Sequence, residues 1–288
     1  MGQKPLCDFS FFEMTRVKMT LFFLFCQTMR GLIFLFILIP LFAVAQELKV
    51  IPIVQIPLVA DQFIGVDEYK SLYYIKGNIF HKTSTEKTYQ FSDLQLGPIS
   101  SVDLINPLRI TLFYNQTNTA LILDNTLNEI TRINFNLLEN FRNVSHARTA
   151  SDRRLWIFNI DLQQLELFDY QTNKIITSSP PLSATAVSMT SNFNRCYIYT
   201  GKELKIYNIY GSILNSMAIL GLSQLHQNND VLFALRNDAV VMLPKDKMDF
   251  IEVNLDEKQV KQLYYANEIL YIYGLGTLST YSLKLPKN

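Results

Sequence analysis

The amino-acid sequence predicts an all-β protein, folded as a six-bladed β-propeller. Apolar and polar residues alternate with period two in many short stretches, which places one set of side chains on one face of a strand. The 288 residues include 15 Tyr and 20 Phe, and aromatic residues are common in strands. A repeat of roughly 40 residues, with four short strands in each copy, is typical of propeller blades.

The clearest copy of the repeat is a hairpin at residues 165–175, LELFDYQTNKI. Its strands alternate, and Asp169 and Asn173 favour the turn between them, because Asp and Asn bond their own backbone and tolerate left-handed geometry. Related copies begin their turns at Asp124 and Asn208, which lie 45 residues before and 39 residues after Asp169. We therefore expect these residues to have a structural role in turns.

A pair of adjacent bulky residues occurs in the second strand of every predicted blade. The second members of successive pairs are 39, 44, 41, 35 and 39 positions apart. This spacing favours a ring of four-stranded units over a β-sandwich, which does not group its strands in fours. The pairs are Tyr73-Tyr74, Leu112-Phe113, Trp156-Ile157, Tyr197-Ile198, Leu232-Phe233 and Tyr271-Ile272.

The first five blades are predicted to be continuous in sequence, whereas the sixth is incomplete. The five span residues 61–93, 99–136, 144–181, 185–220 and 223–256. The sixth starts at Val260 and contains only three strands, at 262–265, 269–273 and 278–283. A blade that lacks its fourth strand leaves an open edge that is prone to mispairing.

The stretch Leu48–Val59 is predicted to be the missing outer strand. It is apolar and strand-like, and Pro52 and Pro57 restrict it to an edge, because an outermost strand needs hydrogen bonds on one side only. Pairing beside Leu278–Leu283 would close the ring with both ends of the domain in one blade. A five-bladed ring with an irregular terminal sheet and a seven-bladed ring are the alternatives.

The N-terminal residues 1–45 are predicted to be a signal peptide that forms a helix. Arg30 precedes the apolar run Leu32–Phe42, and Ala43-Val44-Ala45 matches a small-x-small cleavage site. Cleavage after Ala45 would leave residues 46–288 as a single propeller domain. We therefore expect an exported protein, located in the periplasm, at the outer membrane or outside the cell.

Two alternatives concern the same segment. Met29 is a second candidate for the start of translation. An uncleaved membrane anchor is the other alternative, and it would be the protein's only membrane contact. Residues 32–45 fall short of the ~20 apolar residues that span a bilayer, which favours cleavage.

The residues of the central repeat resemble a known class of propellers. Trp156-Ile-Phe-Asn159, followed by Leu167-Phe-Asp-Tyr-Gln-Thr-Asn-Lys174, is similar to WD40-like and YVTN-like repeats, and the similarity covers residues 61–284. The chain departs from strict WD40 repeats because it has no Gly-His or Trp-Asp pair. The resemblance implies a ring with a central channel and loop-rich faces used for docking. The Ala-Val-Ala-Gln ending of the signal resembles export signals of Bacteroidota-type bacteria.

Composition and motifs argue against several function classes. A formal net charge of +1 is unlike the basic balance of nucleic-acid-binding proteins. The sequence contains no Gly-x-Ser-x-Gly, no phosphate-binding Gly-rich loop, no His-Glu-x-x-His, no paired Cys for zinc and no Asp-rich calcium loop. We therefore predict a protein that is not an enzyme and has no catalytic residues, cofactor or metal.

The remaining candidate site residues fall into two groups. Asp67, Asp103, His146 and His226 lie in or beside innermost strands, which line the channel of a propeller. Carboxylates and imidazoles that converge there could hold a metal or act as acid and base. The alternative is that they are ordinary channel-lining residues and strand-end caps.

Arg153 and Arg154 form the second group, at the start of a strand. Arg is enriched at interface hot spots, so that the pair is a candidate docking site, with a solvated charge cluster as the alternative. The sequence thus favours an exported, non-catalytic propeller that binds or scaffolds a protein partner at the cell envelope. A metal-dependent hydrolase or lactonase that uses the channel, and a glycan or small-molecule binder, are the competing hypotheses.

Overall fold

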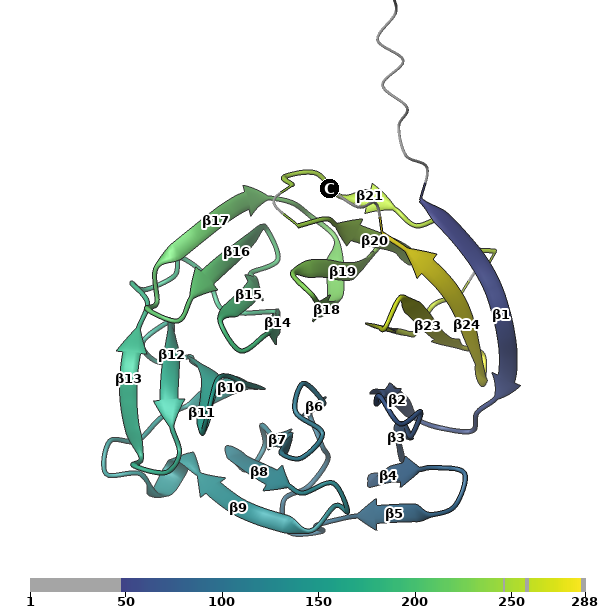
Figure 1. The fold of residues 1–288 in the computed structure, drawn as a ribbon. Helices are drawn as coiled ribbons and strands as arrows, with labels where there is room; N and C mark the ends of the chain where they lie inside the picture. The colour runs from purple at the N-terminus through teal and green to yellow at the C-terminus, as the bar shows by residue number, and fades with distance from the viewer. Residues whose placement is uncertain (1–47, 246, 257–258, 286–288) are drawn as a thin grey trace, which may run out of the picture. The chain divides into compact units, whose positions relative to one another are not determined.

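The computed structural model describes residues 48–245, 247–256 and 259–285. They form six four-stranded antiparallel sheets, arranged as the blades of a ring (Figure 1). The predicted all-β, six-bladed propeller is therefore confirmed. The predicted signal segment 1–45 and its helix lie outside the described residues. Within the described ranges, no helix is long and apolar enough to cross a membrane.

Each of the first five blades uses four consecutive strands, from the innermost to the outermost. They are β2 (Gln62–Val66), β3 (Leu72–Lys76), β4 (Ile79–Thr83) and β5 (Thr88–Phe91) in blade 1; β6 (Ser101–Asp103), β7 (Ile110–Tyr114), β8 (Thr119–Leu123) and β9 (Glu129–Asn134) in blade 2; β10 (Val144–Thr149), β11 (Arg154–Asn159), β12 (Gln164–Asp169) and β13 (Lys174–Ser178) in blade 3; β14 (Ser188–Ser191), β15 (Arg195–Tyr199), β16 (Glu203–Asn208) and β17 (Ile213–Ala218) in blade 4; and β18 (Leu222–Asn228), β19 (Val231–Arg236), β20 (Ala239–Leu243) and β21 (Ile251–Glu252) in blade 5. A short 3-10 helix, η1 (Phe135–Leu137), follows β9.

The sixth blade joins the two ends of the described chain, as predicted. Its strands, from inside to outside, are β22 (Gln262–Ala266), β23 (Ile269–Gly274), β24 (Thr277–Lys284) and β1 (Lys49–Pro57). Strand β1 runs antiparallel to β24, from Lys49 opposite Lys284 to Pro57 opposite Thr277. Figure 1 shows β1 as the outermost strand beside β24. Contacts between β22 and β2 complete the ring.

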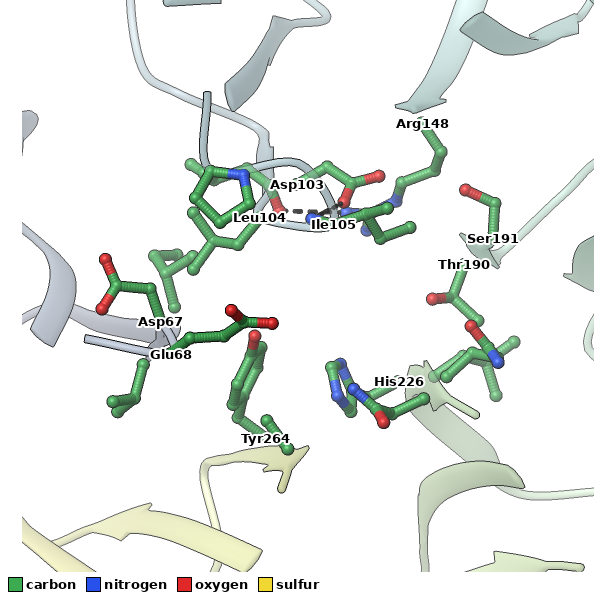
Figure 2. A pocket seen from close by; sticks show the side chains of 18 of the residues that line it. Asp67, Glu68, Asp103, Leu104, Ile105, Arg148, Thr190, Ser191, His226 and Tyr264 are labelled. Atoms are coloured by element: carbon green, nitrogen blue, oxygen red, sulfur yellow. Dashed lines mark hydrogen bonds between the residues drawn. The ribbon is translucent and has the colours of Figure 1, made fainter. Parts of the chain in front are cut away.

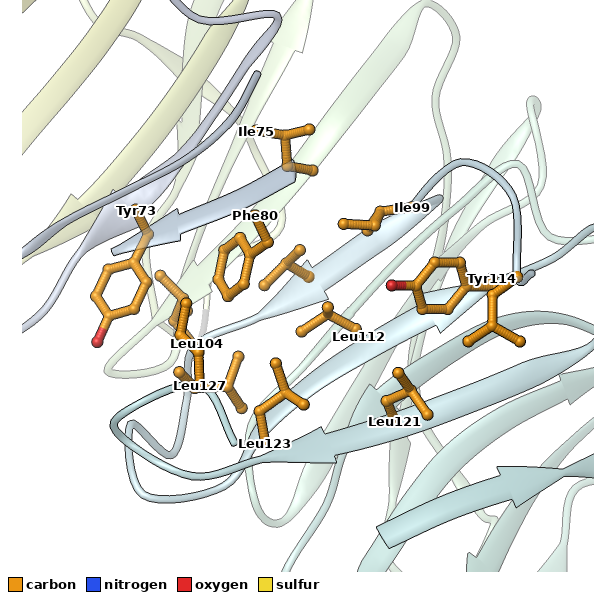
Figure 3. Packing of buried hydrophobic residues seen from close by; sticks show 13 residues of the cluster. Tyr73, Ile75, Phe80, Ile99, Leu104, Leu112, Tyr114, Leu121, Leu123 and Leu127 are labelled. Atoms are coloured by element: carbon orange, nitrogen blue, oxygen red, sulfur yellow. The ribbon is translucent and has the colours of Figure 1, made fainter. Parts of the chain in front are cut away.

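The hydrophobic core of the described residues is divided among the interfaces between blades. Six clusters of buried side chains each join two neighbouring blades. Between blades 1 and 2, Tyr73 and Phe80 pack against Leu112 and Leu121 (Figure 3). The rings of Tyr73 and Phe80 stack with their centroids 5.9 Å apart. Each blade is therefore stabilised by its neighbours.

The bulky pairs seen in the sequence fill these interfaces. Successive residues of a strand point to opposite faces of the sheet. Leu112 accordingly belongs to the cluster between blades 1 and 2, whereas Phe113 belongs to the cluster between blades 2 and 3. Trp156 faces blade 4 and Ile157 faces blade 2 in the same way. The pair recurs because the second strand of a blade must fill the interfaces on both sides.

The repeated Asp and Asn residues close turns, as predicted. The Oδ1 atom of Asp124 accepts hydrogen bonds from the backbone N–H groups of Thr126 and Asn128, at 2.8 and 2.9 Å. In the corresponding turns of blades 3 and 4, Oδ1 of Asp169 accepts from the N–H groups of Gln171 and Thr172, and Oδ1 of Asn208 accepts from those of Tyr210 and Ser212. These side chains are therefore structural.

The strand order places different connections at the two ends of the ring. The connections between successive blades lie at one end, together with the turns between second and third strands; we call this the interblade end. The turns that join first to second and third to fourth strands lie at the opposite end. Because β1 and β24 are antiparallel, the start of β1 and the end of β24 also lie at the opposite end.

Candidate functional site

The first candidate site is a cavity of about 190 Å³ at the end of the ring opposite the interblade end, where the innermost strands finish (Figure 2). Asp67, Asp103 and His226, three of the four predicted channel residues, line it. The fourth, His146, lies on the innermost strand β10 but is not among the lining residues. The other polar or charged side chains of the lining include Glu68, Arg148, Thr190, Ser191 and Tyr264.

Asp67 holds the turn that follows β2. Its Oδ1 atom accepts hydrogen bonds from the backbone N–H groups of Tyr69 and Ser71, at 3.0 and 2.8 Å. Its Oδ2 atom accepts one from the Tyr73 hydroxyl at 3.0 Å and lies 3.5 Å from Nζ of Lys82. The carboxylate is buried and its charge is compensated by these groups, which is the role of a strand-end cap.

Asp103 joins blade 2 to blade 3. Its two carboxylate oxygens accept hydrogen bonds from the N–H groups of Ile105, at 3.0 Å, and Thr149, at 2.9 Å. Arg148 lies beside it on β10 and donates from Nε to the carbonyl of Met189 at 2.8 Å and from Nη1 to that of Val102 at 3.1 Å. Burial lowers the pKa of Arg148, an effect that the negative charge of Asp103 opposes. The pair thus connects three blades.

His226 and Tyr264 form the wall contributed by blades 5 and 6. The Nε2 atom of His226 is 2.9 Å from the carbonyl oxygen of Tyr265, so that Nε2 carries the proton and donates. The two rings lie 4.5 Å apart between centroids. Gly65 allows this packing, because a Cβ atom there would be 2.6 Å from Cε2 of Tyr264. Burial lowers the pKa of His226 to about 4 and leaves the imidazole neutral at pH 7.

The chemistry available in the cavity is that of binding a small polar molecule. Arg148 is a cation, Glu68 is an exposed carboxylate, and His226 is a neutral imidazole. The Ser191 hydroxyl donates to the carbonyl of Thr149 at 2.8 Å, and within the described part of the chain it has no hydrogen bond to a basic side chain. Among the described residues, no group of three or more His, Cys, Asp or Glu side chains could hold a metal ion.

Sequence reasoning did not find Arg148, Tyr264 or Glu68. Arg148 lies in the innermost strand of blade 3, and this position could have indicated that it lines the channel. Tyr264 could not be identified, because strand alternation alone does not say which face of an innermost strand meets the channel. Glu68 lies in the turn after β2, and its position depends on how that turn folds.

The two predicted docking arginines have different environments. Arg153 is exposed in the turn before β11, whereas Arg154 is half-buried as the first residue of that strand. The Nε atom of Arg154 is buried and forms no hydrogen bond with any of the described residues. The available guanidinium at this place is therefore that of Arg153.

Acid is expected to destabilise the fold through two of the histidines. Burial, with the positive charge of Arg148 as a further cause, lowers the pKa of His146 to about 4, as burial does for His226. An unfolded chain has an ordinary His pKa near 6.5, so that it binds protons between pH 6.5 and 4 that the folded chain does not. The free energy of unfolding should therefore fall by roughly 2–4 kcal/mol from pH 7 to pH 5, since one pKa unit corresponds to about 1.4 kcal/mol.

Urea unfolding followed by circular dichroism at the two pH values measures this change. His146→Gln with His226→Gln should flatten the pH dependence. His81→Gln alone should flatten the pH dependence less. The pKa of His81 is also lowered, but this variant removes one histidine whereas the double variant removes two. Burial raises the pKa of Glu166, so that protonation of this group stabilises the fold as the pH falls. This opposes the effect of the histidines and favours the lower end of the range of roughly 2–4 kcal/mol. Equal stability at pH 7 and pH 5 would contradict the neutral, buried state of the imidazoles.

A second candidate site is the surface of the interblade end. Each of the first five connections between blades, counted from the connection after β1, exposes at least one large apolar side chain, with Leu94 90% exposed and Leu137 81% exposed. Contiguous exposed apolar surface often marks a site of protein association. The turn between β11 and β12 and the turn between β23 and β24 lie at the same end and add Leu162 and Leu275. The exposed apolar residues of the interblade end are Val59, Leu94, Leu137, Phe141, Leu162, Val187, Leu220 and Leu275.

Comparison with known proteins bears on the fold. No protein-family model matches the sequence, and no curated protein matches it. A virginiamycin B lyase from Staphylococcus aureus is 11% identical over 83% of this chain and 100% of that chain, with a TM-score of 0.57. A streptogramin B lyase is 10% identical over 83% and 88%, with a TM-score of 0.56. A chain of a mitotic checkpoint complex is 9% identical over 83% and 94%, with a TM-score of 0.57. At such identities the similarity shows the propeller fold alone.

Proposed function

We propose that this chain is an exported, non-catalytic propeller that binds a protein partner at the cell envelope through its interblade end. The observation that supports this role is the recurrence of exposed apolar residues in successive connections at one end of the ring. A single exposed Leu is ordinary, whereas several in consecutive loops form a surface that a partner can cover. Export rests on the predicted signal at residues 1–45.

The state of the channel residues favours binding over catalysis. Asp67 and Asp103 are bonded by backbone N–H groups, and His146 and His226 are neutral at pH 7. The Ser191 hydroxyl in the cavity donates a hydrogen bond to the backbone carbonyl of Thr149. The solved structures with the same fold include lyases and a chain of a checkpoint complex, so that similarity does not choose between the two roles.

Removing the apolar side chains at this end should abolish partner binding without unfolding the ring. Leu94→Ser, Leu137→Ser and Leu220→Ser together would replace three exposed anchors from three connections. Recovery of the partner on the tagged protein, from the cells that produce it, should fall by about tenfold or more, because each anchor in an interface core contributes about 1 kcal/mol or more.

Tyr69→Ser with Tyr210→Ser provides the matched control. These side chains are 84% and 75% exposed in turns at the opposite end. The control should keep the partner. A partner that is lost equally in both variants, or kept in both, would show that the interblade end is not the docking surface.

A further inference from the structure

A groove of about 250 Å³ lies between blades 2 and 3, apart from both sites described above. Its lining includes Arg109 and Arg153, the apolar or aromatic Ile130 and Tyr170, and the buried Ile122. The two arginines occupy equivalent positions, because each is the last residue before the second strand of its blade. Both belong to turns at the opposite end of the ring from the interblade surface.

The two guanidinium groups have no acidic partner among the described residues. Neither side chain forms a hydrogen bond or an ion pair with the part of the chain that the structure describes. By contrast, Arg132 of blade 2 pairs with Glu129 and Asp93, at 2.7 Å each. Asp169, the residue before Tyr170 of the groove, accepts hydrogen bonds from the backbone N–H groups of Gln171 and Thr172. The groove thus presents two uncompensated positive charges.

The floor of the groove is apolar. Ile130 on β9 is 52% exposed, and Tyr170 lies in the turn after β12. The backbone N–H of Tyr170 donates to the carbonyl of Arg153 at 3.2 Å, which ties this turn to the turn that presents the arginine. Asp152, beside Arg153, adopts a left-handed φ of 58°, which Asp tolerates better than most residues. The backbone at Arg153 is therefore held in place by the turn after β12.

We infer that this groove binds an acidic protein segment in which carboxylates flank an apolar side chain. Arg binds carboxylates through two parallel hydrogen bonds, and the apolar floor accommodates the side chain between them. The inference rests on the proposed role in protein binding, but it concerns a different end of the ring. A propeller with both surfaces would hold two partners together.

An anionic membrane is the competing ligand for a basic surface. Recognition of anionic lipids uses clusters of about 4–8 Lys or Arg residues at a surface. The groove instead offers two arginines and an apolar floor, and this arrangement fits a protein segment that inserts an apolar side chain. Vesicles therefore serve as one arm of the test.

The test is a titration of the full chain, labelled at isoleucine δ1 methyl groups, with the peptide Gly-Glu-Glu-Leu-Glu-Glu-Gly and nuclear magnetic resonance detection. The methyl resonances of Ile122 and Ile130 should shift saturably, whereas that of Ile272, buried in blade 6, should not. Replacing the central Leu of the peptide by Gly, or its Glu residues by Lys, should remove the shifts. Arg109→Gln with Arg153→Gln should raise the Kd by about tenfold or more, because two charge-assisted contacts are lost.

Arg236→Gln is the matched control, since this arginine is exposed on blade 5 and its loss changes the charge in the same way. Its Kd should stay within about twofold of the wild type, because screening weakens distant surface charges. The unshifted methyl resonances report that each variant is folded. The triple Ser variant of the interblade end should still bind the peptide, which separates this inference from the proposed function.

Three outcomes would overturn the inference. The first is an absence of shifts at Ile122 and Ile130 at millimolar peptide. The second is an equal loss of affinity in the Arg236→Gln variant, which would indicate non-specific charge attraction. The third is binding to phosphatidylglycerol vesicles that requires Arg109 and Arg153 in a protein that does not bind the peptide, which would assign the groove to a membrane surface.

Discussion

Deletion of Lys49–Pro57 is expected to prevent the ring from closing and to yield an aggregated chain. This segment is the whole of β1, the outermost strand of blade 6, and it pairs along almost all of β24. Without it, β24 becomes an exposed edge of eight residues, and long open edges pair with other chains. Size-exclusion chromatography and circular dichroism measure the loss of the monomeric folded protein.

A permuted chain separates the missing strand from a general effect of shortening. Because Lys49 lies opposite Lys284, residues 48–59 can follow Leu285 through a tight Asn-Gly turn. Blade 6 would then be built from continuous chain, and the permuted protein should fold as a cooperative monomer. A deletion variant that is itself monomeric and unfolds cooperatively would show that the ring does not depend on β1.

Replacement of Arg142 by Met should cost about 3–5 kcal/mol of the free energy of unfolding at pH 7, because it leaves a buried charge unpaired. The Nε atom of Arg142 lies 2.9 Å from Oε2 of Glu166, whose side chain is only 2% exposed. Asn159 is the other group close to this carboxylate, at 3.4 Å. Burial already raises the pKa of Glu166 despite the nearby arginine.

The double variant Arg142→Met, Glu166→Gln should recover most of this loss, because it removes the unpaired charge. The single variant should also be closer to the wild type at pH 5 than at pH 7, because burial raises the pKa of Glu166 and acid favours the uncharged form, which needs no cation. Urea unfolding of the three proteins gives both comparisons. A single variant within 0.5 kcal/mol of the wild type, the usual range for an ordinary surface substitution, would contradict this role.

The same ion pair is relevant to the proposed docking surface. Arg142 belongs to the connection between β9 and β10, which also contains Leu137 and Phe141. Its guanidinium donates to the carbonyls of Asn140 and Phe141, both at 3.0 Å. Loss of Arg142 should therefore loosen the backbone at Phe141, one exposed apolar residue of the interblade end, in addition to lowering stability.

The architecture could be predicted because its signals are local and repeated. The bulky pairs recur because every blade fills two interfaces, and Asp124, Asp169 and Asn208 recur because each closes the same turn. Closure by Leu48–Val59 followed from counting strands in the last blade. Each of these inferences needs only the residues of one blade or its neighbour.

The candidate sites were less predictable, because they depend on residues brought together from different blades. Asp67, Asp103 and His226 were predicted to lie in or beside innermost strands, as channel-lining residues and caps or as a converging site. The sequence does not say that backbone N–H groups would occupy both carboxylates. Arg153 was identified, whereas its partner across the groove, Arg109, was not, because 44 residues and a blade boundary separate them. Exposure of apolar residues in successive connections is likewise invisible until the loops are placed.

The central claim, that a protein partner docks on the interblade end, is tested most directly by site-specific photo-crosslinking in the cells that produce the protein. A photoreactive amino acid would replace Leu94, Leu137 or Leu220 in turn, and Tyr69 or Tyr210 as positions at the opposite end. We expect one and the same protein, identified by mass spectrometry, to be crosslinked from all three interblade positions and from neither tyrosine position. Crosslinks confined to the tyrosine positions, or the absence of any defined crosslinked protein from the interblade end, would contradict the claim.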